Sequence, residues 1–137
     1  MAILLDASVV LAAADEADLN HAAAVAWFAR ADEPLLLGTL TLAELDLLLQ
    51  RELGLAAILA LLRTITGGAI RLVAPTDADL ERAGEHLEAA AEHRPRLADA
   101  ALVATAERLG VRRIATFDRR PIAVSRPAHL RTFDLEP

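Results

Sequence analysis

The chain has 137 residues, of which 55% are hydrophobic and 3% aromatic, and its formal charge is −6. This length and composition suit a single globular domain, residues 1–137, with a core of aliphatic side chains. Cysteine is absent and all 14 basic residues are arginine, which excludes disulfides, thiolate metal sites and mechanisms that need an active-site lysine.

Neither end of the chain indicates a targeting or membrane segment. Met1–Val10 lacks the basic start of a signal peptide, and Asp6 interrupts its apolar run. Elsewhere the longest apolar run is Leu53–Leu62, about half the length that a membrane-spanning helix needs. We therefore expect a cytoplasmic protein with no membrane segment.

In chain order, short apolar runs alternate with helical patterns. The runs that predict strands are Ala2–Asp6, Pro34–Gly38, Ile70–Ala74, Arg113–Asp118 and Leu130–Leu135. The patterns that predict helices are Val9–Ala14, Ala22–Ala31, Leu42–Glu52, Leu55–Thr66, Asp77–His93 and Leu97–Leu109. Alternating strands and helices predict a layered α/β fold with a mainly parallel sheet.

Ligands in such folds bind beyond the carboxyl ends of the strands. Asp6 and Asp118 each end a predicted strand, so we expect both at the same edge of the sheet. Charge is also segregated along the chain. Residues 1–66 hold three arginines and nine acids, whereas residues 94–131 hold nine arginines and three acids. The second segment predicts either a basic face beside an acidic site or an ordinary solvated surface.

Asp6 and Glu44 each have a structural interpretation beside a functional one. Asp6 precedes a predicted helix and suits its N-cap, although Ser8 is equally suited to that role. Glu44 completes a Thr41-x-x-Glu44 capping-box pattern. A glutamate in the first turn of that helix also points toward the end of the sheet, so capping and function are compatible.

Asp99 and Asp118 lie in the second half of the chain. Asp99 opens the helix Leu97–Leu109, where an acid is favourable to the helix dipole. Its neighbours are apolar, however, and burying an unpaired charge is expensive, so this position favours a bound cation. Asp118 is either a turn residue in a surface ion pair with an adjacent arginine or a functional group at a strand end.

Four carboxylates at one edge of a sheet repel one another unless a divalent cation lies among them. Oxygen ligands of this kind suit Mg²⁺ or Mn²⁺. The histidines are scattered without the spacing of a zinc site, and two of them, His86 and His93, lie on a charged helix and are expected to be exposed.

Four segments carry a resemblance to a known family: Ile3–Ser8, Thr41–Leu45, Leu97–Ala106 and Ile114–Arg119. In order, spacing and total length the chain resembles the PIN-domain ribonucleases, and most closely the VapC toxins of type II toxin–antitoxin systems. The resemblance implies a three-layer α/β/α fold with a mainly parallel sheet of about five strands.

The resemblance also implies a function: cleavage of RNA with Mg²⁺ or Mn²⁺, homodimerisation, and inhibition by a cognate VapB-like antitoxin. It assigns the catalytic and metal-binding residues to Asp6, Glu44, Asp99 and Asp118, with Ser8 and Thr116 as supporting hydroxyls. Asp6 and Asp99 are the expected principal ligands, while Glu44 and Asp118 complete the outer ligand set, hold a second ion when substrate arrives, or orient the water.

Two surfaces are candidates for partner binding. The arginines that flank Asp118 are candidates to hold the RNA backbone: Arg112, Arg113, Arg119 and Arg120. The leucine-rich stretches Leu47–Leu49 and Leu55–Leu62 are a candidate groove for an antitoxin helix, or else ordinary packing within the monomer or dimer.

Two other functions remain open on the sequence. One is a catalytically silent RNA- or antitoxin-binding module of the same fold, which the four intact acids argue against. The other is a different Mg²⁺-dependent phosphoryl-transfer enzyme. An aspartyl-phosphate phosphatase usually carries Asp-x-Asp after its first strand, whereas here Ala7 and Ser8 follow Asp6.

Overall fold

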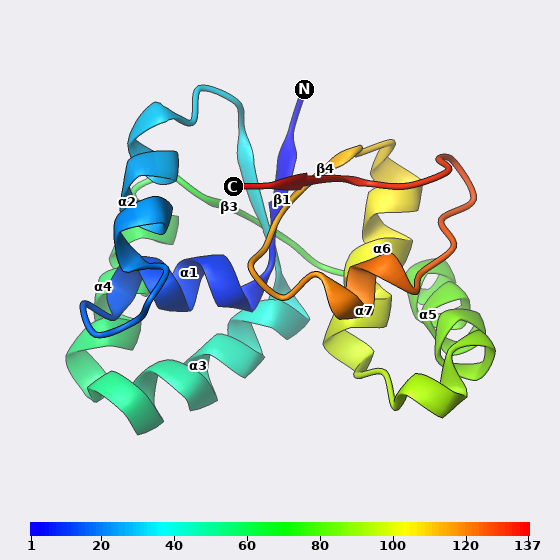
Figure 1. Cartoon of the computed structure of the whole chain (residues 1–137), viewed down its shortest axis with the longest axis horizontal. Helices are drawn as coiled ribbons and strands as arrows, with labels where there is room; N and C mark the ends of the chain where they lie inside the picture. Colours follow the sequence, from blue (N-terminus) through cyan, green and yellow to red (C-terminus); the bar gives the residue numbers. More distant parts are fainter.

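The computed structural model describes all of residues 1–137, and a five-stranded parallel sheet runs through its middle (Figure 1). The strand order is β3-β2-β1-β4-β5, and every adjacent pair is parallel. The strands are β1 (Ile3–Leu5), β2 (Leu35–Gly38), β3 (Arg71–Val73), β4 (Arg113–Ala115) and β5 (Asp134–Glu136). The predicted fold class is therefore confirmed.

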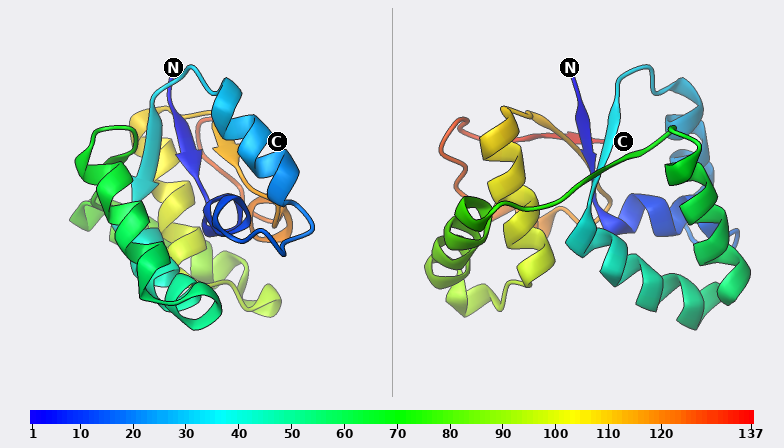
Figure 2. Two further views of the ribbon diagram at one scale, coloured as in Figure 1. Left: turned by 90° about the vertical axis from the view of Figure 1, so that its left-hand side faces the viewer. Right: turned by 180° about the vertical axis from the view of Figure 1, so that it is seen from behind.

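Helices cover both faces of the sheet, as the views in Figures 1 and 2 show. On one face lie α1 (Ala7–Ala14), α2 (His21–Arg30), α3 (Thr39–Leu53) and α4 (Leu55–Thr66). On the other lie α5 (Asp77–Ala89), α6 (Leu97–Leu109) and α7 (Arg120–Ala123). None of these helices combines the length and the hydrophobicity that crossing a membrane requires.

The alternation of side chains along the short strands divides the core in two. Leu5 and its neighbour in β2, Leu37, point to the layer of α1–α4, whereas Leu4 and Ile114 point to α6. All four are at most 1% exposed. Burying each such side chain contributes about 1.5–3 kcal/mol, so the sheet is held rigidly between its two helical layers.

Two helices start directly at the carboxyl ends of central strands. Helix α1 follows β1 with Asp6 as its N-cap, and α3 follows β2 with Gly38 as its N-cap. Helix α3 therefore begins three residues before the predicted Leu42, and Thr41 is a buried residue inside it. The predicted Thr41–Glu44 capping box is wrong, because the helix has already started at Thr39.

The chain after Ala89 differs from the prediction. The helix expected over Asp77–His93 ends at Ala89, and a short 3₁₀ turn, Ala91–His93, leads to Arg94 in the left-handed region with φ 49°. This reversal brings the chain back into α6.

The C-terminal strand also lies later than predicted. It is Asp134–Glu136, not Leu130–Leu135, because Leu130 and Phe133 pack against the core from an irregular segment. Their apolar spacing reflects this packing and not a strand.

His86 is buried, which corrects the expectation that it is exposed. Its Nε2 lies 3.1 Å from Glu107 Oε1, and the same carboxylate accepts two hydrogen bonds from Arg82 and one from the Ala128 N–H. Burial opposes ionisation of Glu107, but these donors outweigh it and lower its pKa. Arg82 and His86 of α5 therefore pair with α6, while Glu81, Glu85 and Glu88 of the same helix remain exposed to solvent.

Candidate functional site

The structure gathers the four predicted acids at the carboxyl edge of the sheet. Asp6 follows β1 directly, and Asp118 lies just beyond β4. Glu44 lies in the second turn of α3, and Asp99 lies in the first turn of α6. The charges of the other three are all near enough to act on Asp99.

Asp6 is held in place through one of its two carboxylate oxygens. Oδ2 accepts hydrogen bonds from the hydroxyls of Ser8 and Thr116, both at 2.7 Å, and a longer one of 3.4 Å from the Ser8 N–H. Oδ1 accepts none from the protein and is not fully buried. The carboxylate is therefore oriented from one side and open to a ligand on the other.

Ser8 and Thr116 extend this arrangement to the loop that carries Asp118. The Ser8 hydroxyl accepts a hydrogen bond from the Phe117 N–H at 2.9 Å, and the Thr116 hydroxyl accepts one from the Asp118 N–H at 3.0 Å. The two hydroxyl oxygens are 3.1 Å apart. The sequence prediction of two supporting hydroxyls agrees with this network, which ties the ends of β1 and β4 together.

Asp99 has no such support. Only 12% of its side chain is exposed, and no protein group donates a hydrogen bond to it. Burial and the charge of Asp6 raise its pKa to about 6, and Glu44 and Asp118 add to this effect, while Arg96 opposes it. A buried, hydrogen-bond-deprived carboxylate among three other acids is an electrostatic cost that a bound cation would remove.

The one cation beside these acids is Arg96. Its Nη1 lies 3.5 Å from Glu44 Oε2, and its Nε lies 4.0 Å from Asp99 Oδ2. The arginine side chain is 63% exposed, and exposed pairs of this kind contribute about 0–1 kcal/mol. Arg96 therefore offsets only part of the negative charge.

The donor set fits a hard divalent cation. No three of the Asp, Glu or His side chains stand close enough together to hold one ion. Mg²⁺, however, is usually bound by one or two carboxylates, with waters filling its other positions. Asp6 and Asp99 offer two carboxylates with oxygens that no protein donor engages, so the residues present fit such an ion.

A groove of about 530 Å³ opens beside Asp99 and Asp118. Three arginines contribute to its lining, most of which comes from the turn before α6 and from α7: His93, Arg94, Pro95, Arg96, Arg120, Pro121, Ala123 and Val124. The groove thus joins the four acids, here called the acidic centre, to a basic wall formed by Arg94, Arg96 and Arg120. This arrangement suits a phosphate-bearing ligand.

Only one of the four arginines predicted to hold RNA lines this groove, namely Arg120. Arg113 begins β4, at the opposite end of the sheet, where Glu136 accepts two hydrogen bonds from it and raises its pKa. Arg112 precedes it at that same end, and Arg119 donates to the carbonyl of Pro137. Arg112 and Arg113 are close to Asp118 in the sequence but distant in space, because β4 lies between them and Asp118.

Sequence reasoning missed Arg94 and Arg96. Arg96 stands three residues before Asp99, a spacing that places two side chains on the same face of a helix, and this signal was available. Arg94 carried no comparable signal, since its place in the groove depends on the left-handed turn before α6.

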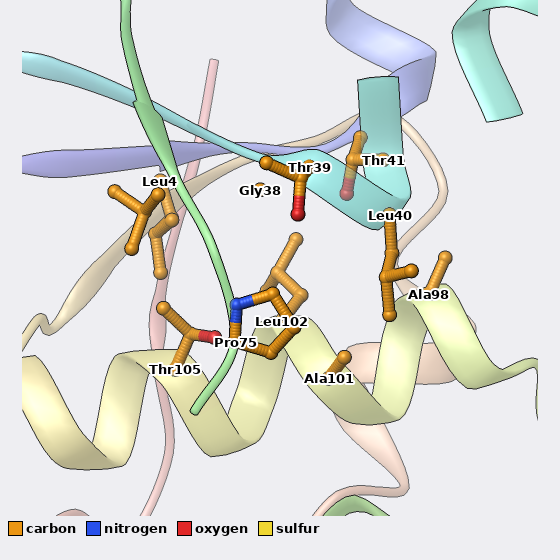
Figure 3. Close-up of a pocket in the computed structure, with 11 residues that line it drawn as sticks. Leu4, Gly38, Thr39, Leu40, Thr41, Pro75, Ala98, Ala101, Leu102 and Thr105 are labelled. Carbon is orange, nitrogen blue, oxygen red and sulfur yellow. The ribbon is translucent and has the colours of Figure 1, made fainter. Parts of the chain in front are cut away.

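A second cavity, about 10 Å³ in volume, lies between the start of α3 and α6 (Figure 3). Thr39, Thr41 and Thr105 line it together with apolar side chains. A space of this size holds about one water molecule, so it is a packing void and not a ligand site.

Comparisons with known proteins identify the family of the chain. Residues 3–127 match the PIN domain. Over 125 residues the chain is 35% identical to ribonuclease VapC26 of Mycobacterium tuberculosis, an alignment that covers 91% of this chain and 93% of that protein.

Solved structures share the fold. VapC20 of Mycobacterium tuberculosis, a toxin that cleaves the sarcin-ricin loop, matches with a TM-score of 0.83 and 23% identity, over 96% of this chain and 98% of that one. VapBC2 of Rickettsia felis, solved with a DNA fragment from its promoter, matches with a TM-score of 0.69 and 13% identity, over 99% and 98% of the two chains. The chain belongs to the PIN-domain family and, within it, to the VapC group.

Proposed function

We propose that this protein is a ribonuclease toxin that hydrolyses RNA phosphodiesters with Mg²⁺ or Mn²⁺ bound by Asp6 and Asp99. The observation that carries the proposal is the state of Asp99, which is buried, accepts no hydrogen bond and has the charges of Asp6, Glu44 and Asp118 around it. The charge of such a group is costly to the folded protein, and a bound divalent cation would offset that cost.

Each residue has a defined part in the proposed reaction. Ser8 and Thr116 hold Asp6 by its Oδ2 atom, which presets its other oxygen for the ion. A divalent cation bound there supplies Lewis-acid activation of water and neutralises charge that develops on the phosphate. Glu44 and Asp118 would complete the outer ligand set through water molecules or orient the attacking water. Water adds to phosphorus and the bond to the 3′ oxygen breaks, which leaves a 5′-phosphate and a 3′-hydroxyl.

RNA is the proposed substrate class for two reasons. The related protein VapC26 is named a ribonuclease, and VapC20 is described as cleaving the sarcin-ricin loop. In this chain, the basic wall of the groove beside Asp99 and Asp118 suits a polyanionic backbone.

The test is RNA cleavage by the antitoxin-free protein in Mg²⁺ or Mn²⁺, compared with the same reaction in EDTA. We expect cleavage only with the metal, because four carboxylates without a cation repel the phosphate backbone. Products should carry 5′-phosphate and 3′-hydroxyl ends. Cleavage in EDTA, or 2′,3′-cyclic phosphate ends, would contradict the proposed chemistry. Metal-dependent RNA binding without cleavage would instead favour a catalytically silent binding module.

We further propose that a cognate VapB-like antitoxin inhibits the protein and that the protein forms homodimers. The related VapBC2 structure holds a toxin–antitoxin pair, as its name indicates. The surface proposed for the antitoxin helix is the leucine surface, defined as the exposed leucines on α3 and α4: Leu47, Leu55, Leu59 and Leu62. An amphipathic helix laid across these side chains would remove them from water.

Leu59→Asp should weaken antitoxin binding by at least about tenfold, because a carboxylate is costly to bury in an apolar interface. The measurement is titration of the variant with the antitoxin, with circular dichroism as the check on folding. Leu80→Asp is the matched control, since Leu80 is 43% exposed, like Leu59 at 41%, but lies on α5. Unchanged antitoxin binding together with loss of the dimer in light scattering would assign the leucine surface to self-association.

A further inference from the structure

Arg96 occupies a position between the acidic centre and the groove. It is the N-cap of α6, and its side chain contacts Glu44 and Asp99 while also lining the 530 Å³ groove. No other arginine of the groove forms an ion pair with any of the four acids. Arg96 is therefore the one basic side chain shared by both halves of the site.

The contacts of Arg96 with the acids are loose. At 3.5 and 4.0 Å from Glu44 and Asp99, neither contact is a hydrogen bond, and 63% of the side chain remains exposed to solvent. Only the backbone of Arg96 is fixed, by its place at the start of α6. A long side chain held this weakly can turn away at little cost once another cation neutralises the acids.

We propose that Arg96 is a positioning residue with two partners: it pairs with Glu44 and Asp99 while the acidic centre lacks a divalent cation, and it turns to a phosphate of bound RNA in the groove once that cation is present. This inference rests on the proposed function and adds a residue and an order of events to it.

The physical basis is competition for the same carboxylates. A divalent ion at Asp6 and Asp99 carries twice the charge of a guanidinium and would lie a few ångströms from it, where like charges repel. Arg96 would then face the groove, in which Arg94 and Arg120 already supply positive charge. A guanidinium suits this role because it can bind a phosphate through two N–H groups at once.

The first measurement is Mn²⁺ affinity without RNA, by calorimetric titration of the antitoxin-free protein. Arg96→Ala should bind Mn²⁺ about fivefold more tightly, since it removes a positive charge about 4 Å from two of the acids. Arg120→Ala is the control, because Arg120 lines the same groove but forms no ion pair with any of the four acids. The Mn²⁺ affinity of this variant should equal that of the unmodified protein.

The second measurement is RNA binding, by anisotropy of a short fluorescein-labelled single-stranded RNA. Asp118→Asn serves as the background to suppress cleavage, and gels check the RNA after each titration. In Mn²⁺, Arg96→Ala should weaken binding several-fold and reduce the salt dependence by about one phosphate contact. In EDTA the same substitution should have no effect, because Arg96 is then paired with the acids.

Arg112→Ala is the control for general loss of positive charge, since Arg112 is exposed at the far end of β4. This variant should change neither the Mn²⁺ affinity nor the RNA affinity.

Equal or weaker Mn²⁺ binding by Arg96→Ala, or the same loss of RNA affinity with and without Mn²⁺, would overturn the inference. If the Asp118→Asn protein binds RNA in neither condition, the proposed function and the RNA part of this inference both fail. If RNA is bound and cleaved but Arg96→Ala matches Arg112→Ala in both assays, only the inference fails.

Discussion

Asp99→Asn should reduce RNA cleavage by about a thousandfold or more while leaving the protein folded. The substitution keeps the size of the side chain but removes the charge of a proposed ligand of the metal ion. Loss of one charged ligand removes several kcal/mol of transition-state stabilisation, and each 1.4 kcal/mol corresponds to about tenfold in rate. The measurement is the initial rate of RNA cleavage in saturating Mn²⁺, with Mn²⁺ affinity measured in parallel.

Asp46→Asn is the matched control for this experiment. Asp46 lies on α3 only two residues from Glu44, but it is exposed and contacts Gln50. The control should cleave RNA at the unmodified rate. Full activity of Asp99→Asn in saturating Mn²⁺ would show that the metal site lies elsewhere or that the observed cleavage comes from a contaminant.

The positions of the site acids could be predicted where they depend on local sequence. Asp6 ends an apolar run, and parallel strands bring their carboxyl ends to one edge, so its place followed from the pattern alone. The same reasoning placed Asp118 beyond β4. Asp99 was identifiable because its apolar neighbours predict a buried helix, and α6 is indeed buried along most of its length.

The basic part of the site could not be predicted in this way. Arg113 and Arg120 are both close to Asp118 in the sequence, yet β4 carries the first to the far end of the sheet and the chain beyond it carries the second into the groove. Arg94 reaches the groove only because the chain reverses there in a left-handed conformation. Such side-chain positions depend on loop geometry, which hydrophobic periodicity does not encode.

His86 illustrates the same limit within a helix. The charged pattern of α5 predicts a solvated face, and Glu81, Glu85 and Glu88 are indeed exposed, but His86 and Arg82 face α6 and pair with Glu107. Periodicity locates the polar face of a helix, whereas the neighbouring element decides whether that face meets water or a partner. Charge pairing across two helices is visible only once both are placed.

Without metal, the contribution of Asp99 to the stability of the protein should fall as the pH rises from about 4 to about 6. Burial and the neighbouring acids raise the pKa of Asp99 from its ordinary value of 3.8 to about 6 in the folded protein, so in this range the folded state holds a proton that the unfolded state has lost. Deprotonation therefore costs the folded state free energy, up to about 3 kcal/mol at 1.36 kcal/mol per pKa unit. The measurement is the free energy of unfolding in urea, in EDTA, across this pH range.

Asp99→Asn isolates this contribution, because asparagine does not titrate while every other group still does. The variant should match the unmodified protein near pH 4 and be more stable by up to about 3 kcal/mol near pH 7. Equal stability at both pH values would mean that Asp99 ionises in the folded state as freely as in the unfolded one. At pH 7, Mn²⁺ should make the unmodified protein more stable than Asp99→Asn, because the unmodified protein binds the ion better. A ligand at a hundred times its Kd stabilises the folded state by about 2.7 kcal/mol. A carboxylate that destabilises the protein in EDTA and stabilises it in Mn²⁺ would have its role in the site, because the helix dipole and Arg96 offset only part of the cost of its charge.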